Sequence, residues 1–408
     1  MKLLSNDAFI NEGDDVILQI NAEARAKMEC GIDVINSSIG SLYDEEGRLA
    51  VPKTTSKYID ELTILDENKT YPSCQGPREY REAVMKWVFK GYYDLVKDNF
   101  QTYGAYAMGG TGAIYLGLRS YAEAGKTVLI PSLGWSNYEA MIKQKGAKYD
   151  YYQMFDGDKS IHVQSIKEKC EQYKSEGRVM IIINDPCENP TGYSFAREEW
   201  VELIKYLNEL SKEVPVILLL DIAYIDMERD DKSRVFFSLI DRFSSNIMIL
   251  IAFSASKLLG IYGYRVGAIL AITQSKEDID DFKKSIPSTI RTTWSMANKA
   301  YAVSIPLVLN DKELENEVKT NNEMLIRRGS HFYDRLKELG LDPVPYKAGF
   351  FVTIDTHGDA KAIAAELKNQ NVYVVPMKKR YLRIAICSTP YNKLDPLADA
   401  IGKVINGN

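Results

Sequence analysis

The sequence predicts an α/β fold, with a large domain built on a mostly parallel sheet between helices and a smaller α+β domain. Three near-continuous apolar runs, at residues 179–183, 216–220 and 247–253, are the first observation behind this prediction. Strands without polar alternation are buried on both faces, as in a parallel sheet covered by helices. The second observation is that helix-like and strand-like stretches alternate from about residue 78 to residue 273.

Other elements follow from hydrophobic periodicity and from glycine positions. Before the apolar runs, the pattern predicts a helix over residues 79–96, a helix over 111–124 that Gly125 ends, and a strand over 127–130. After them, it predicts two helices and three short strands, at residues 296–309, 312–339, 350–354, 372–375 and 381–386.

The chain has 408 residues, which is too long for one compact pair of layers, so we expect two domains. Residues 54–310 form the predicted large domain, because the alternating pattern lies within them. Residues 311–408 form the predicted C-terminal small domain. Residues 1–53 are assigned to an N-terminal arm and to part of the small domain.

Acidic and basic residues are interspersed along the chain, and the formal net charge is −5. Such a pattern lacks the basic patch with which proteins bind nucleic acid or anionic membranes. No apolar run approaches the ~18 residues that a membrane span needs. We therefore expect a cytoplasmic protein with small-molecule substrates and with neither a nucleic-acid nor a membrane partner.

The five cysteines are odd in number, widely scattered and never spaced as Cys-x-x-Cys. This spacing argues against a disulfide framework and against a zinc site, so we predict reduced thiols and no metal. Histidine, the usual general base of hydrolases, occurs only three times. Its scarcity directs the search for catalytic groups toward lysine and the carboxylates.

A single lysine, Lys257, stands among small polar residues directly after the third apolar run. A buried strand that ends in a lysine delivers the amine to a cleft poor in water, where it becomes a better nucleophile. Ser254, Ser256 and Arg265 supply hydroxyls and a guanidinium that suit a phosphate dianion. This is the chemistry of a covalently held pyridoxal phosphate, although a surface lysine after a core strand explains the segment equally well.

Polar residues follow the other two apolar runs and are expected at the same edge of the sheet. Asp221 ends an apolar strand, where an unpaired carboxylate is costly, so it needs a cation such as a protonated pyridine nitrogen. Asn189 and Tyr224 carry groups that donate to a ring phenolate oxygen. The alternatives are a loop cap or arginine bridge for Asp221, a turn for Asn189 and a core position for Tyr224.

A glycine turn and a tryptophan precede helices at this edge. Gly110 and Thr111 lie where a helix begins, so unpaired backbone N–H groups face any anion in the turn. Trp135 offers an aromatic face on which a flat cofactor ring stacks. The alternative for Gly110 and Thr111 is a plain turn without a ligand. The alternative for Trp135 is a position in the core.

Two arginines near the end of the chain suit carboxylates. Arg383 lies in the alternating strand 381–386, where an inward arginine among apolar residues needs an anion, and a carboxylate binds it in bidentate fashion. A structural salt bridge is the alternative. Arg291 is compatible with either role.

Taken together, these motifs resemble the class I (fold type I) pyridoxal-phosphate aminotransferases, and most closely the aspartate aminotransferases. The resemblance spans nearly the whole chain, because six motifs occur in the family's order and spacing. It implies that Lys257 holds the cofactor covalently and acts as general base, while Asp221 pairs with the pyridine nitrogen. It also implies that Asn189 and Tyr224 contact the phenolate oxygen and Trp135 the ring face.

The same resemblance assigns the phosphate and substrate contacts. The phosphate would be held by Gly110, Thr111, Ser254, Ser256 and Arg265. Arg383 would bind the substrate α-carboxylate, with Gly40 closing over it. Tyr71 would reach the phosphate of a neighbouring subunit, which implies a homodimer with shared sites. Arg291 matches the partner-subunit arginine that binds a side-chain carboxylate, so aspartate or glutamate is the expected substrate, with aromatic amino acids as the alternative.

The chain departs from the aspartate aminotransferase pattern at three places. Tyr138 stands where histidine is usual beside the pyridine-binding aspartate, and residues 294–297, with Met296, replace Tyr-Ser-Asn-Pro. Arg383 is followed by Ile384 and Ala385 instead of a polar residue at the second position. Two rival functions use the same cofactor. One is β-elimination from a sulfur amino acid on the same fold. The other is a non-catalytic, cofactor-binding regulatory domain, although no basic helix-turn-helix segment precedes residue 40.

Overall fold

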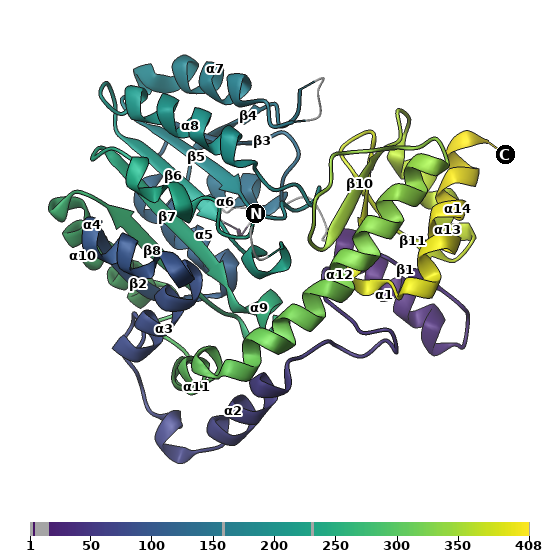
Figure 1. Cartoon of the computed structure of the whole chain (residues 1–408), viewed down its shortest axis with the longest axis horizontal. Coiled ribbons are helices and arrows are strands. Elements are labelled where there is room, and N and C mark those ends of the chain that lie inside the picture. The colour runs from purple at the N-terminus through teal and green to yellow at the C-terminus, as the bar shows by residue number, and fades with distance from the viewer. Residues whose placement is uncertain (1–2, 5–15, 157–159, 230–231, 408) are drawn as a thin grey trace.

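The computed structural model describes residues 3–4, 16–156, 160–229 and 232–407, and it forms two lobes (Figure 1). The larger lobe contains a seven-stranded sheet, in the order β2-β8-β7-β6-β5-β3-β4. In that order the strands are Gln101–Met108, Val266–Thr273, Ile247–Ser254, Val216–Asp221, Val179–Asn184, Thr127–Pro131 and Lys148–Tyr152. The three apolar runs predicted as buried strands are therefore β5, β6 and β7, which lie side by side.

The sheet is parallel except at β8, which runs antiparallel to both β7 and β2. Every residue of β5, β6, β7 and β8 is buried, because helices cover both faces of the sheet. Neighbouring residues of one strand enter different cores: Leu218 packs on one side and Leu219 on the other. The edge strand β4 is mostly half-buried and contains a lysine and three tyrosines, so its sequence carries no apolar run.

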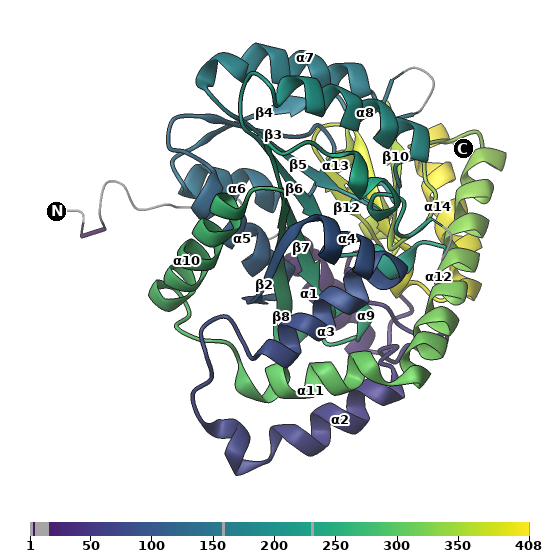
Figure 2. The same ribbon diagram turned by 60° about the vertical axis from the view of Figure 1, so that its left-hand side comes forward.

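Helices cover both faces of the sheet, as the two views together show (Figures 1 and 2). One face is covered by α5 (Gly109–Tyr121), α6 (Asn137–Gln144) and α10 (Lys276–Thr292). The other is covered by α3 (Arg78–Phe89), α7 (Val163–Tyr173) and α8 (Arg197–Leu210).

The large lobe also contains α2 (Lys53–Thr63), α4 (Tyr93–Asn99), the short α9 (Ala255–Leu258) and α11 (Lys299–Asn310). The helix predicted over residues 79–96 is interrupted, because Lys90 has a positive φ of 43° and ends α3. The helix predicted over residues 296–309 begins at Lys299 instead of Met296, since Ser295 has φ 74° and cannot join an α-helix.

The smaller lobe combines strands from both ends of the chain. An antiparallel sheet has the order β12-β13-β10-β9, with strands Val375–Met377, Tyr381–Ala385, Phe351–Asp355 and Asp342–Pro343. A parallel pair joins β1 (Ile35–Asn36) to β11 (Val372–Tyr373), so the strand predicted at 372–375 is split between two sheets. The helices of this lobe are α1 (Val16–Glu29), α13 (Ala360–Asn369) and α14 (Leu394–Asn406).

The long helix α12 (Lys312–Glu338) runs from one lobe to the other (Figure 1). Asp311 caps it by accepting a hydrogen bond from the Glu313 N–H (3.0 Å). Val318 packs in the core of the large lobe, whereas Leu325 and Phe332 pack in the core of the small lobe. Because one helix belongs to both cores, we retain the predicted boundaries at residues 53 and 310 as a proposal.

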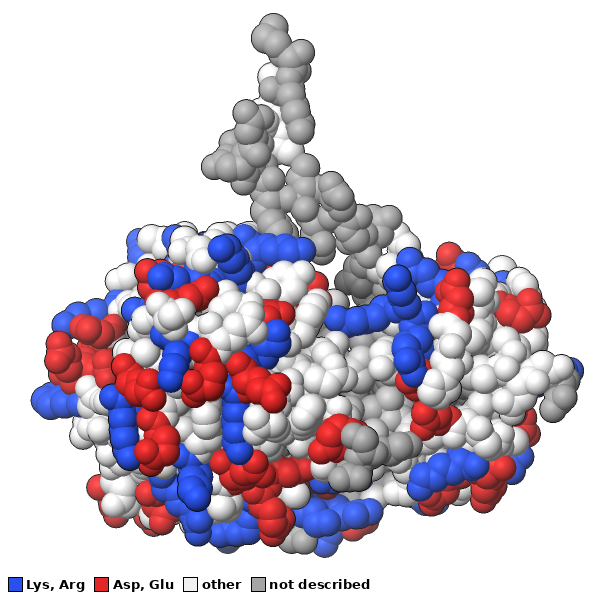
Figure 3. Space-filling model, turned by 90° about the horizontal axis from the view of Figure 1, so that it is seen from above, with Lys and Arg blue, Asp and Glu red and all other residues white. Residues whose placement is uncertain are grey.

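No helix in the described ranges is long and apolar enough to cross a membrane. Lysine and arginine alternate with aspartate and glutamate over the face drawn in Figure 3, where neither sign of charge forms a continuous field.

Candidate active site

A pocket of about 220 Å³ lies at the carboxyl edge of the large sheet, where the small lobe faces it. The ends of β5, β6 and β7 and the start of α5 meet there, as in other open parallel sheets. Most of the predicted site residues line this pocket: Gly40, Gly110, Thr111, Trp135, Asn189, Asp221, Tyr224, Ser254, Ser256, Lys257, Arg265 and Arg383.

Lys257 enters the pocket from α9, the single turn of helix that follows β7. Ser254 caps this turn by accepting a weak hydrogen bond from the Ser256 N–H (3.4 Å). Burial lowers the pKa of Lys257 to about 8, and the positive charges of Arg265 and Arg383 act in the same direction. A lysine with this pKa is partly neutral at physiological pH, so it is available as a nucleophile and as a base.

Asp221 ends β6 and is only 4% exposed. Its carboxylate accepts hydrogen bonds from the Tyr138 hydroxyl (2.6 Å) and from the Ala223 N–H (3.1 Å). Burial raises the pKa of Asp221, while these two bonds and the nearby Lys257 oppose the rise. No cation of the described residues forms an ion pair with Asp221, so a positively charged ligand group is the natural partner of this carboxylate.

An anion cradle lies in the same pocket as Lys257. Gly109 has φ 70°, and a Cβ added there would lie 2.7 Å from Arg265 Nη2, so only glycine lets this guanidinium reach the start of α5. The next backbone N–H groups, of Gly110 and Thr111, lie in the first turn of α5. The buried Ser256 hydroxyl has no hydrogen-bond partner within the described residues. Together these groups suit a phosphate.

Arg383 approaches the pocket from β13 in the small lobe and is 4% exposed. Its Nη2 donates to the Ser38 carbonyl (2.8 Å) and its Nη1 approaches Asn189 Oδ1 (3.5 Å). The guanidinium also lies over the ring of Phe351, 4.4 Å from its centroid. A Cβ on Gly40 would lie 2.8 Å from Phe351 Cζ, so glycine permits the segment around residue 40 to pack closely here.

Two further residues, Asn184 and Trp135, line the walls. Asn184 connects the ends of β5 and β6, since its side chain donates to the Asp221 carbonyl (2.7 Å) and accepts from the Asn189 N–H (2.8 Å). Trp135 meets Tyr138 edge to face, with ring centroids 5.5 Å apart. The pocket thus joins an amine, a buried carboxylate, an anion cradle and a second buried guanidinium.

A family model described as aminotransferase class I and II matches residues 32–401 of this chain. The chain belongs to this aminotransferase family. The transaminase is 26% identical to an aspartate aminotransferase of Haemophilus influenzae, over 78% of this chain and 80% of the relative. It is 24% identical to an aromatic-amino-acid aminotransferase of Escherichia coli, over 71% of this chain and 72% of the relative.

Solved structures resemble the transaminase over its whole length. An aminotransferase from Anaerococcus prevotii superposes with a TM-score of 0.93 at 30% identity and covers 100% of both chains. An aromatic-amino-acid aminotransferase from Burkholderia pseudomallei, covalently bound to pyridoxal phosphate, gives 0.82 at 22% identity, with 99% of this chain and 100% of that one covered. The predicted fold type I architecture is confirmed, and the chain is a pyridoxal-phosphate-dependent transaminase.

The residues of the transaminase fit this cofactor. The buried Asp221 carboxylate lacks a cationic partner among the described residues, as a site for a protonated ring nitrogen requires. The Ser256 hydroxyl and the close approach of Arg265 to Gly109 suit the phosphate. Lys257 lines the same pocket and carries a primary amine, the group that forms an imine with an aldehyde.

Two predicted residues lie outside the pocket. Tyr71 is 89% exposed, and Arg291 is an exposed residue whose Nη1 donates to the Ser295 hydroxyl (2.7 Å). Both were assigned to a site completed by a second subunit. Their roles therefore stay predictions.

Some pocket residues were missed by sequence reasoning. Asn184 directly follows the run 179–183 and Ala223 lies three residues after the run 216–220, so both had the same positional signal as their neighbours. Ile17, Ile114 and Phe351 also line the pocket, but apolar side chains in helices and strands carry no signal that separates them from core residues. Tyr138 was noted only as a departure from the family pattern, and the structure shows that its hydroxyl contacts Asp221.

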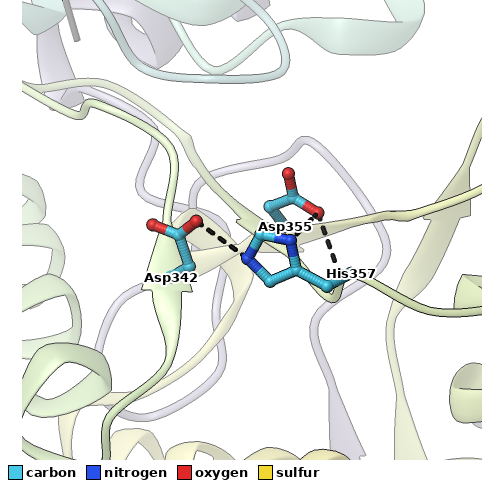
Figure 4. Close-up of side chains that lie close together, drawn as sticks. All are labelled: Asp342, Asp355 and His357. Carbon is cyan, nitrogen blue, oxygen red and sulfur yellow. Dashed lines mark hydrogen bonds and ion pairs between the residues drawn. The ribbon is translucent and has the colours of Figure 1, made fainter. Parts of the chain in front are cut away.

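Asp342, Asp355 and His357 form a cluster with metal-ligand chemistry in the small lobe (Figure 4). Arg380 is part of it, since this guanidinium donates to Asp355 Oδ1 (2.5 Å) and to His357 Nδ1 (2.8 Å). Because a guanidinium only donates, Nδ1 accepts and Nε2 carries the proton that faces Asp342 (3.0 Å). We interpret the cluster as an ion-pair network.

Proposed function

We propose that this transaminase moves an amino group between aspartate or glutamate and a 2-oxo acid, with aromatic amino acids as alternative donors. The observation that carries the proposal is the placement of Arg383, which presents a buried guanidinium to the same pocket as Lys257 and Asp221. A substrate α-carboxylate suits that guanidinium. The names of the relatives, aspartate and aromatic-amino-acid aminotransferases, support both groups of donors.

We assign the roles of the pocket residues as follows. Asp221 keeps the cofactor's ring nitrogen protonated, and Trp135, Asn189 and Tyr224 orient the ring. When bound, pyridoxal phosphate withdraws electrons from the substrate carbon that loses a proton. Lys257 Nζ accepts the proton from Cα of the amino acid and holds it for return, which its pKa of about 8 allows.

Phosphate and carboxylate contacts fix the position of the substrate. Gly110, Thr111, Ser254, Ser256 and Arg265 are assigned to the phosphate. Arg383 holds the α-carboxylate, and the segment at Gly40 packs over it. These contacts position Cα beside Lys257 Nζ, so proton transfer needs no large movement of the base.

The proposed enzyme is a homodimer in which Tyr71 and Arg291 serve the partner's site. Their exposure in the single chain supports this role, because Tyr71 is 89% exposed and no described cation except Lys257, Arg265 and Arg383 lines the pocket. A side-chain carboxylate would then be bound by Arg291 from the second subunit. We also propose a cytoplasmic location, supported by five free cysteines.

An amino-donor panel tests the function. The purified enzyme is supplied with 2-oxoglutarate and with aspartate, tyrosine, phenylalanine or alanine, and glutamate formation is measured. We expect aspartate to be the best donor and Arg291→Ala to lower its kcat/KM by about a hundredfold, the loss expected for a bidentate charged contact. Alanine turnover serves as the control, because it has no side-chain carboxylate.

The panel also separates the rival functions. Lys257→Ala should abolish turnover in all cases. Release of pyruvate and ammonia from an added sulfur amino acid, without an oxo acid, would identify β-elimination. Absence of turnover with every donor would indicate a regulatory domain. None of the observed features favours either rival.

A further inference from the structure

Tyr262 begins the short 3-10 helix Tyr262–Tyr264, in the loop between Lys257 and Arg265. Its side chain is half-buried and does not line the active-site pocket. It lines instead a separate, mostly apolar cavity of about 280 Å³, together with residues of the range 49–60. Because this cavity leaves the packing around Tyr262 incomplete, polar contacts contribute to holding the tyrosine in one position.

Tyr262 contacts the two functional groups that flank it in the sequence. Its backbone carbonyl accepts a hydrogen bond from Arg265 Nη1 (2.9 Å). Its ring faces Lys257, whose Nζ lies 5.1 Å from the ring centroid. The same Nζ lies 5.9 Å from the ring of Tyr224. One residue outside the pocket therefore contacts both the amine and the guanidinium of the anion cradle.

The backbone that passes over the carboxylate site belongs mainly to the small lobe. We call residues 37–45 the closing segment. The Ser38 carbonyl accepts from Arg383 Nη2 (2.8 Å), and the Tyr43 N–H donates to the Cys387 carbonyl (3.0 Å). These bonds fix the segment to β13 and to the turn that follows this strand.

A single contact joins the closing segment to the large lobe by a hydrogen bond. The Leu42 N–H donates to the Tyr262 hydroxyl (2.8 Å). No other hydrogen bond between described residues connects the closing segment to the large lobe. The Tyr262 ring also packs against the hydrophobic core of the small lobe. By both its hydroxyl and its ring, Tyr262 crosses the boundary between the lobes.

We propose that Tyr262 is a positioning residue for transamination, which couples the closing segment to the loop that carries Lys257. Its hydroxyl holds Leu42, two residues beyond Gly40, so the segment stays packed over an α-carboxylate bound to Arg383. The proposal rests on the assignment of Arg383 and Gly40 to the α-carboxylate under the proposed function. A substrate is then enclosed by both lobes through one hydrogen bond that it does not itself make.

Steady-state kinetics of the cofactor-loaded Tyr262→Phe variant tests this role. The variant loses the hydroxyl but keeps the ring beside Lys257. With 2-oxoglutarate and the best donor of the panel, we expect KM for both substrates to rise about fivefold, the scale of one hydrogen bond. kcat should change by less than about twofold. A substitution that only destabilised the protein would lower kcat through loss of active enzyme and leave KM unchanged.

Hydrogen–deuterium exchange gives a readout that needs no turnover. In the cofactor-loaded protein, the Leu42 amide is protected by its bond to the Tyr262 hydroxyl. The peptide that contains Leu42 should exchange about fivefold faster in Tyr262→Phe than in the parent. Peptides from the middle of α12 should exchange equally in both proteins, because the substitution does not touch them.

Tyr264→Phe is the matched control. Tyr264 lies in the same 3-10 helix, and its ring stacks on that of Tyr301, with centroids 4.9 Å apart. Its hydroxyl forms no hydrogen bond with the described residues. This variant should therefore keep the parent's KM values and the parent's exchange at Leu42.

Unchanged KM values in Tyr262→Phe would overturn the proposal, and so would exchange at Leu42 equal to that of the parent. Failure of the proposed donor preference is distinguishable, because it appears in the parent enzyme as a different ranking of donors. The KM comparison uses whichever donor ranks first, and the exchange comparison uses none.

Discussion

The Asp221 carboxylate is buried against the hydroxyl of Tyr138, itself 1% exposed, at a distance of 2.6 Å. The family usually has histidine here, so the donor to the aspartate has changed in type while the contact is retained. A phenol donates but carries no positive charge, so Tyr138 favours the charged form of Asp221 without forming an ion pair with it. This leaves the carboxylate available for the cofactor's ring nitrogen.

We expect Tyr138→Phe to weaken cofactor binding by about tenfold, since a hydrogen bond to a charged group contributes roughly 1.5–3 kcal/mol. Loss of the donor raises the pKa of Asp221 further, which weakens its hold on a protonated nitrogen. Absorbance titration of cofactor-free protein with pyridoxal phosphate measures the dissociation constant.

The control for this substitution is Tyr152→Phe. Tyr152 is 2% exposed and donates to the Ile182 carbonyl (3.1 Å), so its loss affects stability without touching Asp221. Equal dissociation constants for Tyr138→Phe and Tyr152→Phe would show that the Tyr138 hydroxyl has no role in cofactor binding.

Glu188 is a second buried acid near Asp221. Its Oε2 accepts from the N–H (2.9 Å) and the hydroxyl (2.6 Å) of Thr191, while burial raises its pKa to about 8. The folded protein therefore holds this proton more tightly than the unfolded chain, whose glutamates titrate near pH 4.3. Stability should fall as pH rises between these two values.

Glu188→Gln should remove this contribution. The variant should be more stable than the parent by roughly 1–3 kcal/mol at pH 8.5, the scale of an unpaired buried charge, with a smaller or reversed difference at pH 5. Urea unfolding of cofactor-free protein at both pH values measures the effect. Asp185, whose pKa burial raises to about 7, leaves a residual slope in both proteins, so only the difference between them is diagnostic. If the stability of the parent and of Glu188→Gln changed equally between pH 5 and pH 8.5, the raised pKa of Glu188 would be contradicted.

At the scale of elements, the turn from β2 into α5 positions the anion cradle. Gly109 adopts φ 70° at the start of α5, and its missing side chain makes room for Arg265, which itself has φ 55°. Two unusual backbone conformations thus face each other where the phosphate is expected. This geometry depends on β2 and β8 being neighbours in the sheet.

Gly109→Ala should force the Arg265 guanidinium away, because the new Cβ would lie 2.7 Å from Nη2. We expect cofactor affinity to fall by at least tenfold, with stability lowered by about 1–2 kcal/mol from the positive φ. Gly125→Ala is the matched control, since Gly125 has φ 79° and open space around the added Cβ. Both variants should lose similar stability, but only Gly109→Ala should lose cofactor affinity, measured by the same absorbance titration.

The apolar strands and the long helix α12 were predictable because burial and hydrophobic periodicity leave local patterns in the sequence. The strands β2 and β4 were not, because they are at the edges of the sheet and only partly buried, so neither carries a continuous apolar run. The interruption of the helix predicted over residues 79–96 at Lys90 was also unpredictable, since a positive φ in lysine arises from tertiary packing and not from intrinsic preference.

At the scale of the whole molecule, the site draws on both lobes and, in our proposal, on a second subunit. Arg383 of the small lobe approaches Asn189 Oδ1 (3.5 Å), and Thr353 of the same lobe donates to the Pro190 carbonyl (2.7 Å) in the loop that carries Asn189. Movement of one lobe against the other would therefore alter the carboxylate site directly.

Shared sites predict complementation between inactive chains. Lys257→Ala and Arg291→Ala are each expected to be poor in aspartate transamination, but a mixed dimer contains one site with both residues intact. When equal amounts of the two variants are refolded together and pair at random, about half of the dimers are mixed and each has one intact site of two. The mixture should therefore recover about a quarter of the parent's activity with aspartate. The measurement is glutamate formation, with each variant refolded alone as control. Mixtures no more active than the separate variants would argue against a shared site.

The sequence by itself determined the fold class, the cofactor chemistry and most of the pocket residues. It did so because a doubly buried strand and the polar residue at its end are both visible over a few positions of the chain. Only the tertiary structure decided which distant groups touch: Tyr138 with Asp221, 83 positions apart, and Arg383 with the Ser38 carbonyl, 345 apart. Such contacts depend on how the lobes and sheet neighbours pack, and local patterns carry no record of that packing.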